Sequence, residues 1–256
     1  MLVVGTNLEW ETEGRDRESM DLPGGQPELI RRVCAANGLT VVVVNSGSVV
    51  TSDWAEVAPA VLQTWFGGQE MADALVDVLV GDDEPSGRLP TTMPHRLEDT
   101  PAFLSYPGEN GRVVYSEGLF TGYRWYEARR LPVAFPFGHG LGYTSFTWGE
   151  PVLGGVPSIS ELEAGTGVTV TVPVTNNGDR AGSEVVQCYV APMSPRLTRP
   201  VRELQGFAKV RLEPGATADV VVVLDHRAFA YWDPADPGHS ERSSGVPVAA
   251  GRGSGP

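Results

Sequence analysis

The sequence predicts an α/β sandwich with a partial, mostly parallel sheet, followed by a smaller all-β sandwich. Two observations predict this order. Short apolar runs alternate with helical patterns up to about residue 143, and beyond about residue 145 apolar residues recur with a period of two. The chain has 256 residues, 41% of them hydrophobic, which is enough for one large core or two modest ones, and the length favours two.

The chain begins with a strand, a helix and a second strand. "LVVG" (2–5) is a short apolar strand, and "TVVVVNSGS" (40–48) is a β-branched run that ends in turn residues. Between them, "PELIRRVCAAN" (27–37) opposes two arginines to an apolar helical face made of Leu29, Ile30, Val33 and Cys34. This alternation predicts parallel strands joined by a right-handed crossover.

A further strand and helix follow. "AVLQTWF" (60–66) is typical of a strand, and "QEMADALVDVLVG" (69–81) is typical of a helix. The helix is predicted to end at Gly81, after apolar residues with helical spacing: Ala72, Leu75, Val76 and Leu79.

The second half of the chain indicates antiparallel strands. "GVTVTVPVTNNGD" (167–179) alternates Val168, Val170, Val172 and Val174 inward before an Asn-Gly turn. "SEVVQCYVAP" (183–192) is a strand, and "RELQGFAKVRLEPGATADVVVVL" (202–224) is two strands joined by the turn "EPGA". We expect a sandwich of the immunoglobulin or fibronectin type III kind.

These patterns predict three segments. Residues 1–143 form the α/β part, and the boundary lies near "FPFGHGLGYTSF" (135–146), where the helices stop. Residues 144–233 form the β-sandwich. Residues 234–256 are rich in Gly, Pro and Ser and are predicted to be a disordered tail.

Composition excludes several classes of function. A net charge of −13 argues against nucleic acid as a partner, because phosphate binding needs clustered Lys and Arg. No run of 18 apolar residues is present, which argues against a membrane partner. Met1 is followed by "LVVG" without the features of a signal peptide, so we expect the chain as given to be cytoplasmic.

Neither a metal nor another cofactor is expected. Cys34 and Cys188 form no CxxC pair and are interpreted as buried thiols. His95 and His226 lie far from His139 in sequence, so a His-based metal site has little support, and His139 is interpreted as a structural residue. "GDDEPSG" (81–87) lacks the spacing of a calcium loop and is interpreted as a helix-to-strand turn.

The acidic segment "EWETEGRDRESMDLP" (9–23) is either a solvated loop or a functional one. Its six carboxylates are Glu9, Glu11, Glu13, Asp16, Glu18 and Asp21. Loops that leave parallel strands at their carboxyl ends share one sheet edge, and the segments after the first three strands do so. Like charges raise a carboxyl pKa, as a general acid requires, and the flat face of Trp10 suits a sugar ring. Asp16 and Arg17 are expected to brace the loop.

Several ordered motifs then carry a resemblance. They are "WETEGRDRESMDLPGGQPELIRRV", "VVVVNSGS", "WFGGQEMADALVDVLVGDDEPSGRLPTTMP", "YSEGLFTGYRWYE" and "FPFGHGLGYTSF", followed by a β-sandwich. Together they resemble the C-terminal half of a family 3 glycoside hydrolase of the β-glucosidase type, over about residues 1–233. In that family a barrel domain supplies an Asp nucleophile, and the α/β domain supplies a Glu acid/base from an E-G-x-D-R loop. The resemblance assigns that role to Glu13.

The chain also departs from the family. Two residues after the acid/base the family often carries an aromatic that stacks on the leaving group, and here that position is Arg15, so the usual aglycone preference does not carry over. The barrel, the first strands of the α/β part and the closing strand of the β-sandwich are expected to be missing. Aromatics of "YSEGLFTGYRWYE" (115–127) could line a sugar site or pack between the two domains.

The resulting hypothesis is the C-terminal part of a retaining β-glucosidase or related β-glycosidase. Glu13 is the catalytic residue, and Trp10 and Arg15 bind substrate. The expected partners are a β-linked oligosaccharide or glycoside and a separate barrel domain, without which the chain is expected to be inactive. The alternative is a non-catalytic α/β plus β-sandwich protein that binds carbohydrate or a partner chain. A nucleotide-binding domain that uses "NSGS" has weak support, because no Gly-rich phosphate motif follows a strand.

Overall fold

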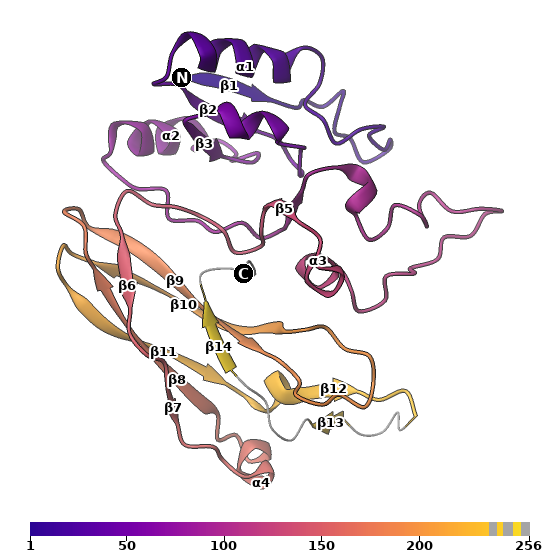
Figure 1. The fold of residues 1–256 in the computed structure, drawn as a ribbon, viewed down its shortest axis with the longest axis vertical. Coiled ribbons are helices and arrows are strands. Elements are labelled where there is room, and N and C mark those ends of the chain that lie inside the picture. The colour runs from indigo at the N-terminus through magenta and orange to yellow at the C-terminus, as the bar shows by residue number, and fades with distance from the viewer. Residues whose placement is uncertain (236–239, 243–247, 252–256) are drawn as a thin grey trace. The chain divides into compact units, whose positions relative to one another are not determined.

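A computed structural model of the chain describes residues 1–235, 240–242 and 248–251 (Figure 1). The chain divides into two compact units. The first unit is made of Met1–Asp83, Thr91–Ser116 and Leu131–Pro136, and the second of Glu84–Pro90, Glu117–Arg130 and the residues from Phe137 onward.

The first unit is built on a parallel sheet of three strands in the order β1-β2-β3. They are β1 (Leu2–Gly5), β2 (Val41–Asn45) and β3 (Ala60–Gln63), and both pairings are parallel. The β-branched side chains of β2 are almost fully buried, as expected for the central strand of a sheet that is covered by helices. The predicted strands and their parallel pairing are confirmed.

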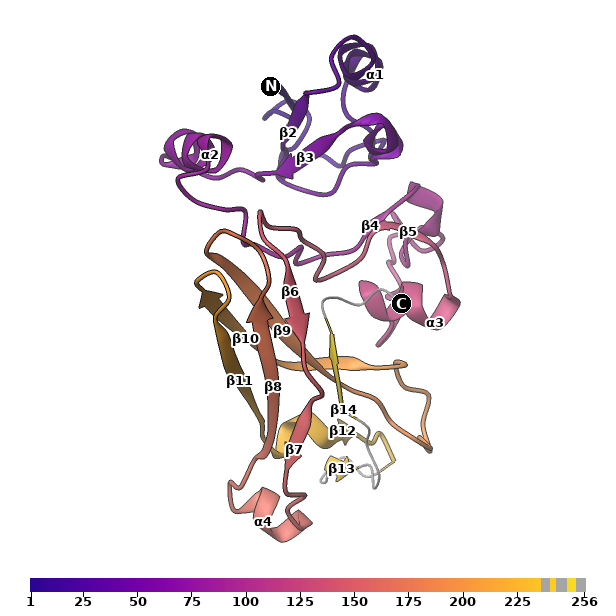
Figure 2. The ribbon, with the colours of Figure 1, turned by 60° about the vertical axis from the view of Figure 1, so that its left-hand side comes forward.

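Helices α1 (Gln26–Ala36) and α2 (Met71–Val80) lie on opposite sides of this sheet (Figures 1 and 2). Ile30 and Cys34 of α1 are buried in the core, whereas Leu29, predicted to lie on the same face, is exposed. No side chain of α2 is buried, although its apolar spacing was predicted correctly. Gly81 ends α2 in the left-handed conformation at φ 85°, which favours glycine.

The remaining elements of the first unit are short. They are the 3-10 helices η1 (Asp53–Val57) and η2 (Leu97–Asp99) and the antiparallel pair β4 (Met93–Pro94) and β5 (Val133–Phe135). Trp54 of η1 is buried in the core with Leu22, Ile30 and Val50, and its indole N–H donates to the Thr51 carbonyl at 3.1 Å. A buried Trp whose N–H is satisfied anchors the connection between β2 and β3.

The second unit contains two sheets, in the orders β10-β9-β14 and β11-β8-β6, with β7 also paired to β8. Their strands are β6 (Phe146–Trp148), β7 (Val152–Gly154), β8 (Val168–Asn176), β9 (Gly182–Val190), β10 (Glu203–Leu212), β11 (Thr217–Leu224) and β14 (Val248–Gly251). The short elements are α3 (Tyr123–Arg129), α4 (Ile159–Glu163), η3 (His226–Phe229) and the pair β12 (Ala230–Trp232) and β13 (Ser240–Arg242).

The predicted alternation of β8 is confirmed. Val168, Val170, Val172 and Val174 are all buried, while the residues between them are partly exposed. Because side chains of a strand alternate between its two faces, this strand presents one apolar face to the core shared with β9 and β11.

The two predicted turns of the sandwich join strands of different sheets, so neither closes a hairpin. β8 pairs with β11, and β9 pairs with β10. Asn176, which is fully buried, holds the first of these corners: its amide donates to the carbonyls of Arg180 at 2.7 Å and Leu212 at 3.0 Å, and its Oδ1 accepts from Thr144 at 2.6 Å. Local sequence marks a turn, but it does not reveal which sheet the next strand joins.

The segment predicted to be a disordered tail contains two strands, β13 and β14, and at those residues the prediction is wrong. β14 pairs with β9 antiparallel, with Val248 opposite Val190. Backbone hydrogen bonds can pair a strand of a few residues without demanding particular side chains. The Gly-rich and Ser-rich composition of the segment therefore gave no sign of this strand. The other residues after 235 lie outside the described part of the chain.

By packing, the segments 84–90, 117–130 and 137–143 belong to the second unit, although the predicted boundary places them in the α/β part. Buried charged side chains attach the segment 84–90 to β9: Arg88 pairs with Glu184 at 2.6 Å, and the Ser183 amide donates to Glu84. Tyr123 is stacked on Phe137, and its hydroxyl accepts from the Leu204 amide at 2.7 Å.

Candidate active site

Three loops that leave the carboxyl ends of the parallel strands surround one open depression of about 390 Å³ in the first unit. This arrangement agrees with the expectation that they share a sheet edge. The loop after β1 contributes Glu11, Thr12, Glu13, Arg15, Asp16 and Arg17, the loop after β2 contributes Gly47 and Ser48, and the loop after β3 contributes Phe66.

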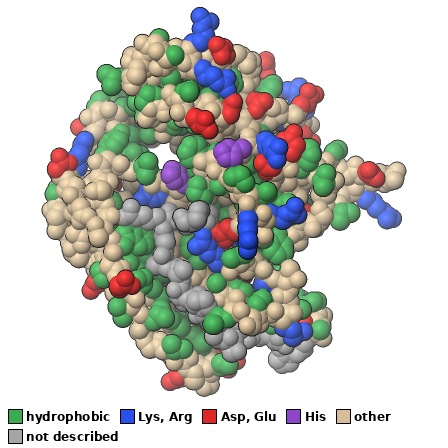
Figure 3. All heavy atoms as spheres, in the orientation of Figure 1, with side chains coloured by type: hydrophobic (Ala, Val, Ile, Leu, Met, Phe, Trp, Pro, Cys, Tyr) green, Lys and Arg blue, Asp and Glu red, His purple; other side chains and the backbone are tan. Residues whose placement is uncertain are grey.

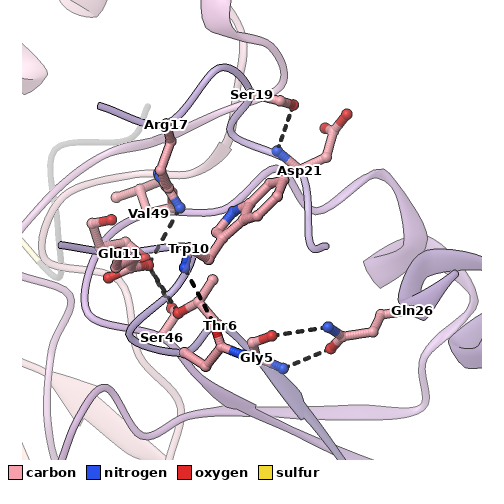
Figure 4. Close-up of polar contacts among 12 residues, drawn as sticks. Gly5, Thr6, Trp10, Glu11, Arg17, Ser19, Asp21, Gln26, Ser46 and Val49 are labelled. Atoms are coloured by element: carbon pink, nitrogen blue, oxygen red, sulfur yellow. Dashed lines mark hydrogen bonds and ion pairs between the residues drawn. The ribbon is translucent and has the colours of Figure 1, made fainter. Parts of the chain in front are cut away.

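The base of the acidic loop is fixed at the end of β1. The Gln26 amide side chain forms two hydrogen bonds with Gly5, donating to its carbonyl at 2.9 Å and accepting from its N–H at 2.7 Å (Figure 4). The Asn7 side chain then accepts from the backbone N–H groups of Glu9 and Trp10 at 3.0 and 3.1 Å. This turn is typical of Asn, whose side chain can replace a backbone acceptor.

Glu11 is a structural carboxylate. Its Oε1 accepts from the Thr6 hydroxyl at 2.9 Å and lies 3.3 Å from Nη1 of Arg17 (Figure 4). The Nη2 of Arg17 donates to the Val49 carbonyl at 2.7 Å, which ties the acidic loop to the loop after β2. The side chains of Glu11 and Arg17 are only 13% and 15% exposed. The predicted bracing role of Arg17 is confirmed.

Two other carboxylates also secure the loop. Asp16 accepts from the Tyr106 hydroxyl, and this hydrogen bond is the main cause of a raised pKa at Tyr106. Asp21 accepts from the Thr51 hydroxyl, and the Thr51 amide donates to the Met20 carbonyl at 2.8 Å. Asp16 therefore braces the loop as predicted, and Asp21 does so as well.

Glu13 lies at the tip of the loop. Thr12 and Arg15 form an antiparallel bridge, with the Arg15 amide donating to the Thr12 carbonyl at 3.4 Å, so that Glu13 and Gly14 form the turn between them. The guanidinium of Arg15 also donates to the Glu9 carbonyl. Glu13 is exposed and lines the depression, in contrast to the braced Glu11. The loop is thus held on both sides of Glu13.

The predicted site residues are not all brought together. Glu13 and Arg15 both line the depression, whereas Trp10 does not. Its indole ring extends toward Asp21 instead of toward Glu11 (Figure 4). The Asn7 turn fixes the backbone at Trp10, whose N–H donates to both the side chain and the carbonyl of Asn7.

Two lining residues, Thr12 and Phe66, have no role in the site predicted from the sequence. Phe66 follows Trp65 in "TWFGGQE", where the sequence predicts the strand 60–66 and then the loop "GGQE" at the shared sheet edge; the strand ends earlier, at Gln63. A signal was available, because an aromatic pair followed by two glycines at a strand end lies at the same edge as Glu13.

The site shows no arrangement suited to a metal ion or a phosphate loop. Within residues 1–235, 240–242 and 248–251, no group of three or more His, Cys, Asp or Glu side chains could hold a metal. In the "NSGS" loop the Ser46 hydroxyl donates to the Ser48 carbonyl at 2.8 Å, so it is occupied within the loop. On the face shown in Figure 3, acidic and basic side chains are interspersed over the upper part of the molecule.

No helix in the described part of the chain is long and apolar enough to cross a membrane.

Two family models match the chain. The model of the glycosyl hydrolase family 3 C-terminal domain matches residues 1–143, and that of a fibronectin type III-like domain matches residues 184–243. The chain therefore belongs to glycosyl hydrolase family 3, with a mixed sheet and helix domain followed by a fibronectin type III-like domain.

Its individual relatives are β-glucosidases. The chain is 49% identical over 234 residues to a probable β-glucosidase I of Aspergillus clavatus and 50% identical over 237 residues to a β-glucosidase of Rhizobium radiobacter. Each match covers 91% of this chain but only 28% of the relative, so the chain spans less than a third of their length.

Solved structures show the same likeness. The β-glucosidase from Kluyveromyces marxianus in complex with glucose is 43% identical with a TM-score of 0.90, covering 98% of this chain and 30% of that one. A β-glucosidase from Streptomyces venezuelae in complex with D-glucose is 37% identical with a TM-score of 0.86, covering 98% of this chain and 31% of that one.

Proposed function

We propose that the chain is the C-terminal part of a retaining β-glucosidase that hydrolyses terminal β-glucosidic bonds, and that Glu13 is its acid/base. The observation that carries the proposal is the contrast among the carboxylates of one loop. Glu11, Asp16 and Asp21 are held by hydrogen bonds, whereas Glu13 is exposed at the tip of the braced turn and lines the depression.

In this role Glu13 first protonates the leaving oxygen and then removes a proton from the water that hydrolyses the glycosyl-enzyme. Retention also needs a second carboxylate as nucleophile, roughly 5 to 5.5 Å from the first. Glu11 and Asp16 line the same depression but are already engaged by Arg17 and Tyr106. We therefore assign the nucleophile to a separate barrel domain, as the family resemblance implies.

Arg15 is proposed to contact the substrate, because it lines the depression beside Glu13. A substrate contact by Trp10 stays a prediction, since its ring lies outside the depression. The chain matches only 28% of the length of each of these two relatives, which is consistent with a larger enzyme to which this chain supplies the acid/base.

The test is a chimera in which this chain replaces the matching segment of the Rhizobium radiobacter β-glucosidase. Glu13→Ala should slow glucosides with poor leaving groups by about 10² to 10⁴, and activated aryl glucosides far less, because acid assistance matters most when the leaving oxygen is basic.

Glu11→Ala is the matched control. Because Glu11 only braces the loop, its removal should slow good and poor substrates by similar factors. If Glu11→Ala shows the dependence on the leaving group and Glu13→Ala does not, the assignment of the acid/base is wrong.

A further inference from the structure

Three Asn-Gly pairs occur in the chain, at residues 37–38, 110–111 and 177–178. Glycine after asparagine favours an intramolecular reaction in which the backbone nitrogen of the glycine attacks the side-chain amide carbon, because no glycine side chain hinders the approach. All three asparagines are exposed to solvent, so exposure does not distinguish them. The hydrogen bonds of their polar groups do.

The first pair is held at the end of α1. The N–H of Asn37 donates to the Val33 carbonyl at 2.9 Å, and its side chain accepts from the Leu39 amide at 2.9 Å. Its carbonyl accepts from the Thr40 hydroxyl at 2.7 Å. Rotation of the Asn37 side chain or backbone therefore breaks hydrogen bonds that fix the residue on both sides.

The third pair is held at the corner of the β-sandwich. The N–H of Asn177 donates to the Ser145 carbonyl at 2.8 Å, and its side-chain amide donates to the Thr147 hydroxyl. The attacking nitrogen is also engaged, because the Gly178 N–H donates to the Asn176 side chain at 3.0 Å. Both reacting groups of this pair are thus occupied.

The second pair forms the tip of a hairpin. Glu109 and Arg112 close the turn with two backbone hydrogen bonds, each 3.0 Å long. Asn110 and Gly111 between them have φ values of 51° and 73°, and two positive φ values in a two-residue loop define a type I′ turn. Among the described residues, neither Asn110 nor the N–H of Gly111 has a hydrogen-bond partner. Rotation of the Asn110 side chain therefore breaks no hydrogen bond.

This turn reaches the attacking geometry without opening the hairpin. The first central residue has ψ of about 30° in a type I′ turn and about −120° in a type II′ turn. A flip of the peptide plane between Asn110 and Gly111 converts one type into the other and keeps the bonds between Glu109 and Arg112. Gly111 tolerates both signs of φ, and a Cβ there would meet no atom within 4 Å. The flip brings the Gly111 nitrogen to the side of the Asn110 Cβ, next to the side-chain amide carbon.

We propose that Asn110 is a site of spontaneous deamidation, to which the fold directs the reaction among the three Asn-Gly pairs. The Gly111 nitrogen forms a bond to Cγ of Asn110, the bond from Cγ to Nδ2 breaks, and the proton of the attacking nitrogen leaves with the side-chain nitrogen as ammonia. Water then adds to either carbonyl of the cyclic imide and returns a proton to the ring nitrogen, which gives aspartate or isoaspartate. The reaction needs no enzyme and does not depend on the proposed function.

The product changes the charge and the main chain of the hairpin. Either product adds one negative charge beside Glu109, so the formal net charge of −13 becomes −14. Isoaspartate also inserts one atom into the main chain of a turn that has only two central residues, which disturbs the pairing of Glu109 with Arg112.

The experiment incubates the purified chain in mildly alkaline buffer and follows each pair by mass spectrometry of tryptic peptides. Cleavage after arginine places the three asparagines in different peptides, residues 33–88, 97–112 and 131–180. Each hydrogen bond that must break first slows the cyclisation by up to about tenfold, so Asn110 should deamidate about tenfold faster than Asn37 or Asn177. Its rate should rise with pH, because the attacking nitrogen must lose its proton.

The same chain in urea is the matched control, since it keeps the sequence and removes the structure. All three pairs should then convert at similar rates. Asn110→Gln provides a second control, because its longer side chain does not form the five-membered imide. This variant should lack the early gain of one negative charge that isoelectric focusing detects in the intact wild-type chain.

Three results would overturn the proposal. The first is conversion of Asn37 or Asn177 in the folded chain as fast as that of Asn110. The second is a preference for Asn110 that persists unchanged in urea, which would assign it to the local sequence instead of the fold. The third is a gain of negative charge by the Asn110→Gln chain as early as by wild type.

Discussion

The ion pair between Glu11 and Arg17 should be the interaction that holds the acidic loop in place. Two unit charges 3.3 Å apart attract by about 5 kcal/mol at an effective dielectric constant of about 20. Desolvation offsets much of this attraction, because both side chains are largely buried. Hydrogen bonds to charged groups retain about 1.5–3 kcal/mol, so we expect a coupling energy near 2 kcal/mol between the two residues.

A double-mutant cycle of Glu11→Gln and Arg17→Gln measures this coupling. The free energy of unfolding of the first unit is read from hydrogen exchange of the β2 amides, since β2 is paired on both sides. The matched control is the pair Arg31 and Asp53, whose side chains are 40% and 65% exposed. Exposed pairs contribute about 0–1 kcal/mol. A Glu11–Arg17 coupling no larger than that of the control pair would refute the reasoning.

Three further outcomes are expected. The purified chain by itself should hydrolyse 4-nitrophenyl β-D-glucoside no faster than buffer, and turnover that disappears with Glu13→Gln would contradict this. Burial and the nearby Arg88 lower the pKa of His139, so the unfolded state binds the proton more readily than the folded state. The free energy of unfolding should therefore fall as the pH drops below about 6.5, the pKa of a histidine in the unfolded chain. In urea titrations at several pH values, His139→Asn should reduce this dependence. Removing residues 234–256 should expose the edge of β9 and raise the aggregated fraction in light scattering, whereas removing only 252–256 should have no effect.

Periodicity predicted the elements of the fold well, because burial imposes it directly on the sequence. The valines of β8 and the apolar run of β2 identify strands whose packing leaves little choice of side chain. The same reasoning failed for Leu29, which is exposed. The spacing of apolar residues identifies the apolar face of a helix, but it does not show how much of that face the neighbouring elements cover. Periodicity also failed for β14, because its four residues are too few to show a period of two within a segment rich in Gly, Pro and Ser.

Contacts between residues far apart in sequence were not predictable. Arg88 and Glu184 are 96 residues apart, and nothing in either local sequence marks them as partners, yet their buried pair ties the segment 84–90 to the β-sandwich. The turn at Asn176 was evident, but its role as a corner between sheets depends on Leu212 and Thr144.

The candidate site was predicted in its position but only partly in its composition. The sheet edge follows from the order of strands, and the resemblance placed Glu13 within it. Which carboxylates brace the loop depends on Thr6, Arg17 and Tyr106, whose positions only the folded loop reveals. The direction of Trp10 and the exposure of Phe66 likewise depend on loop conformation.

The most direct test of the central claim is the product that azide gives with the Glu13→Ala chimera. If Glu13 is the acid/base, its removal leaves space on the side of the departed leaving group, where azide can attack the covalent glycosyl-enzyme. We predict faster turnover with azide and a β-glucosyl azide product, identified by NMR. An α-glucosyl azide would show that Glu13 is the nucleophile, and an absence of rescue with unchanged hydrolysis of poor substrates would show that it does not act on the leaving group at all.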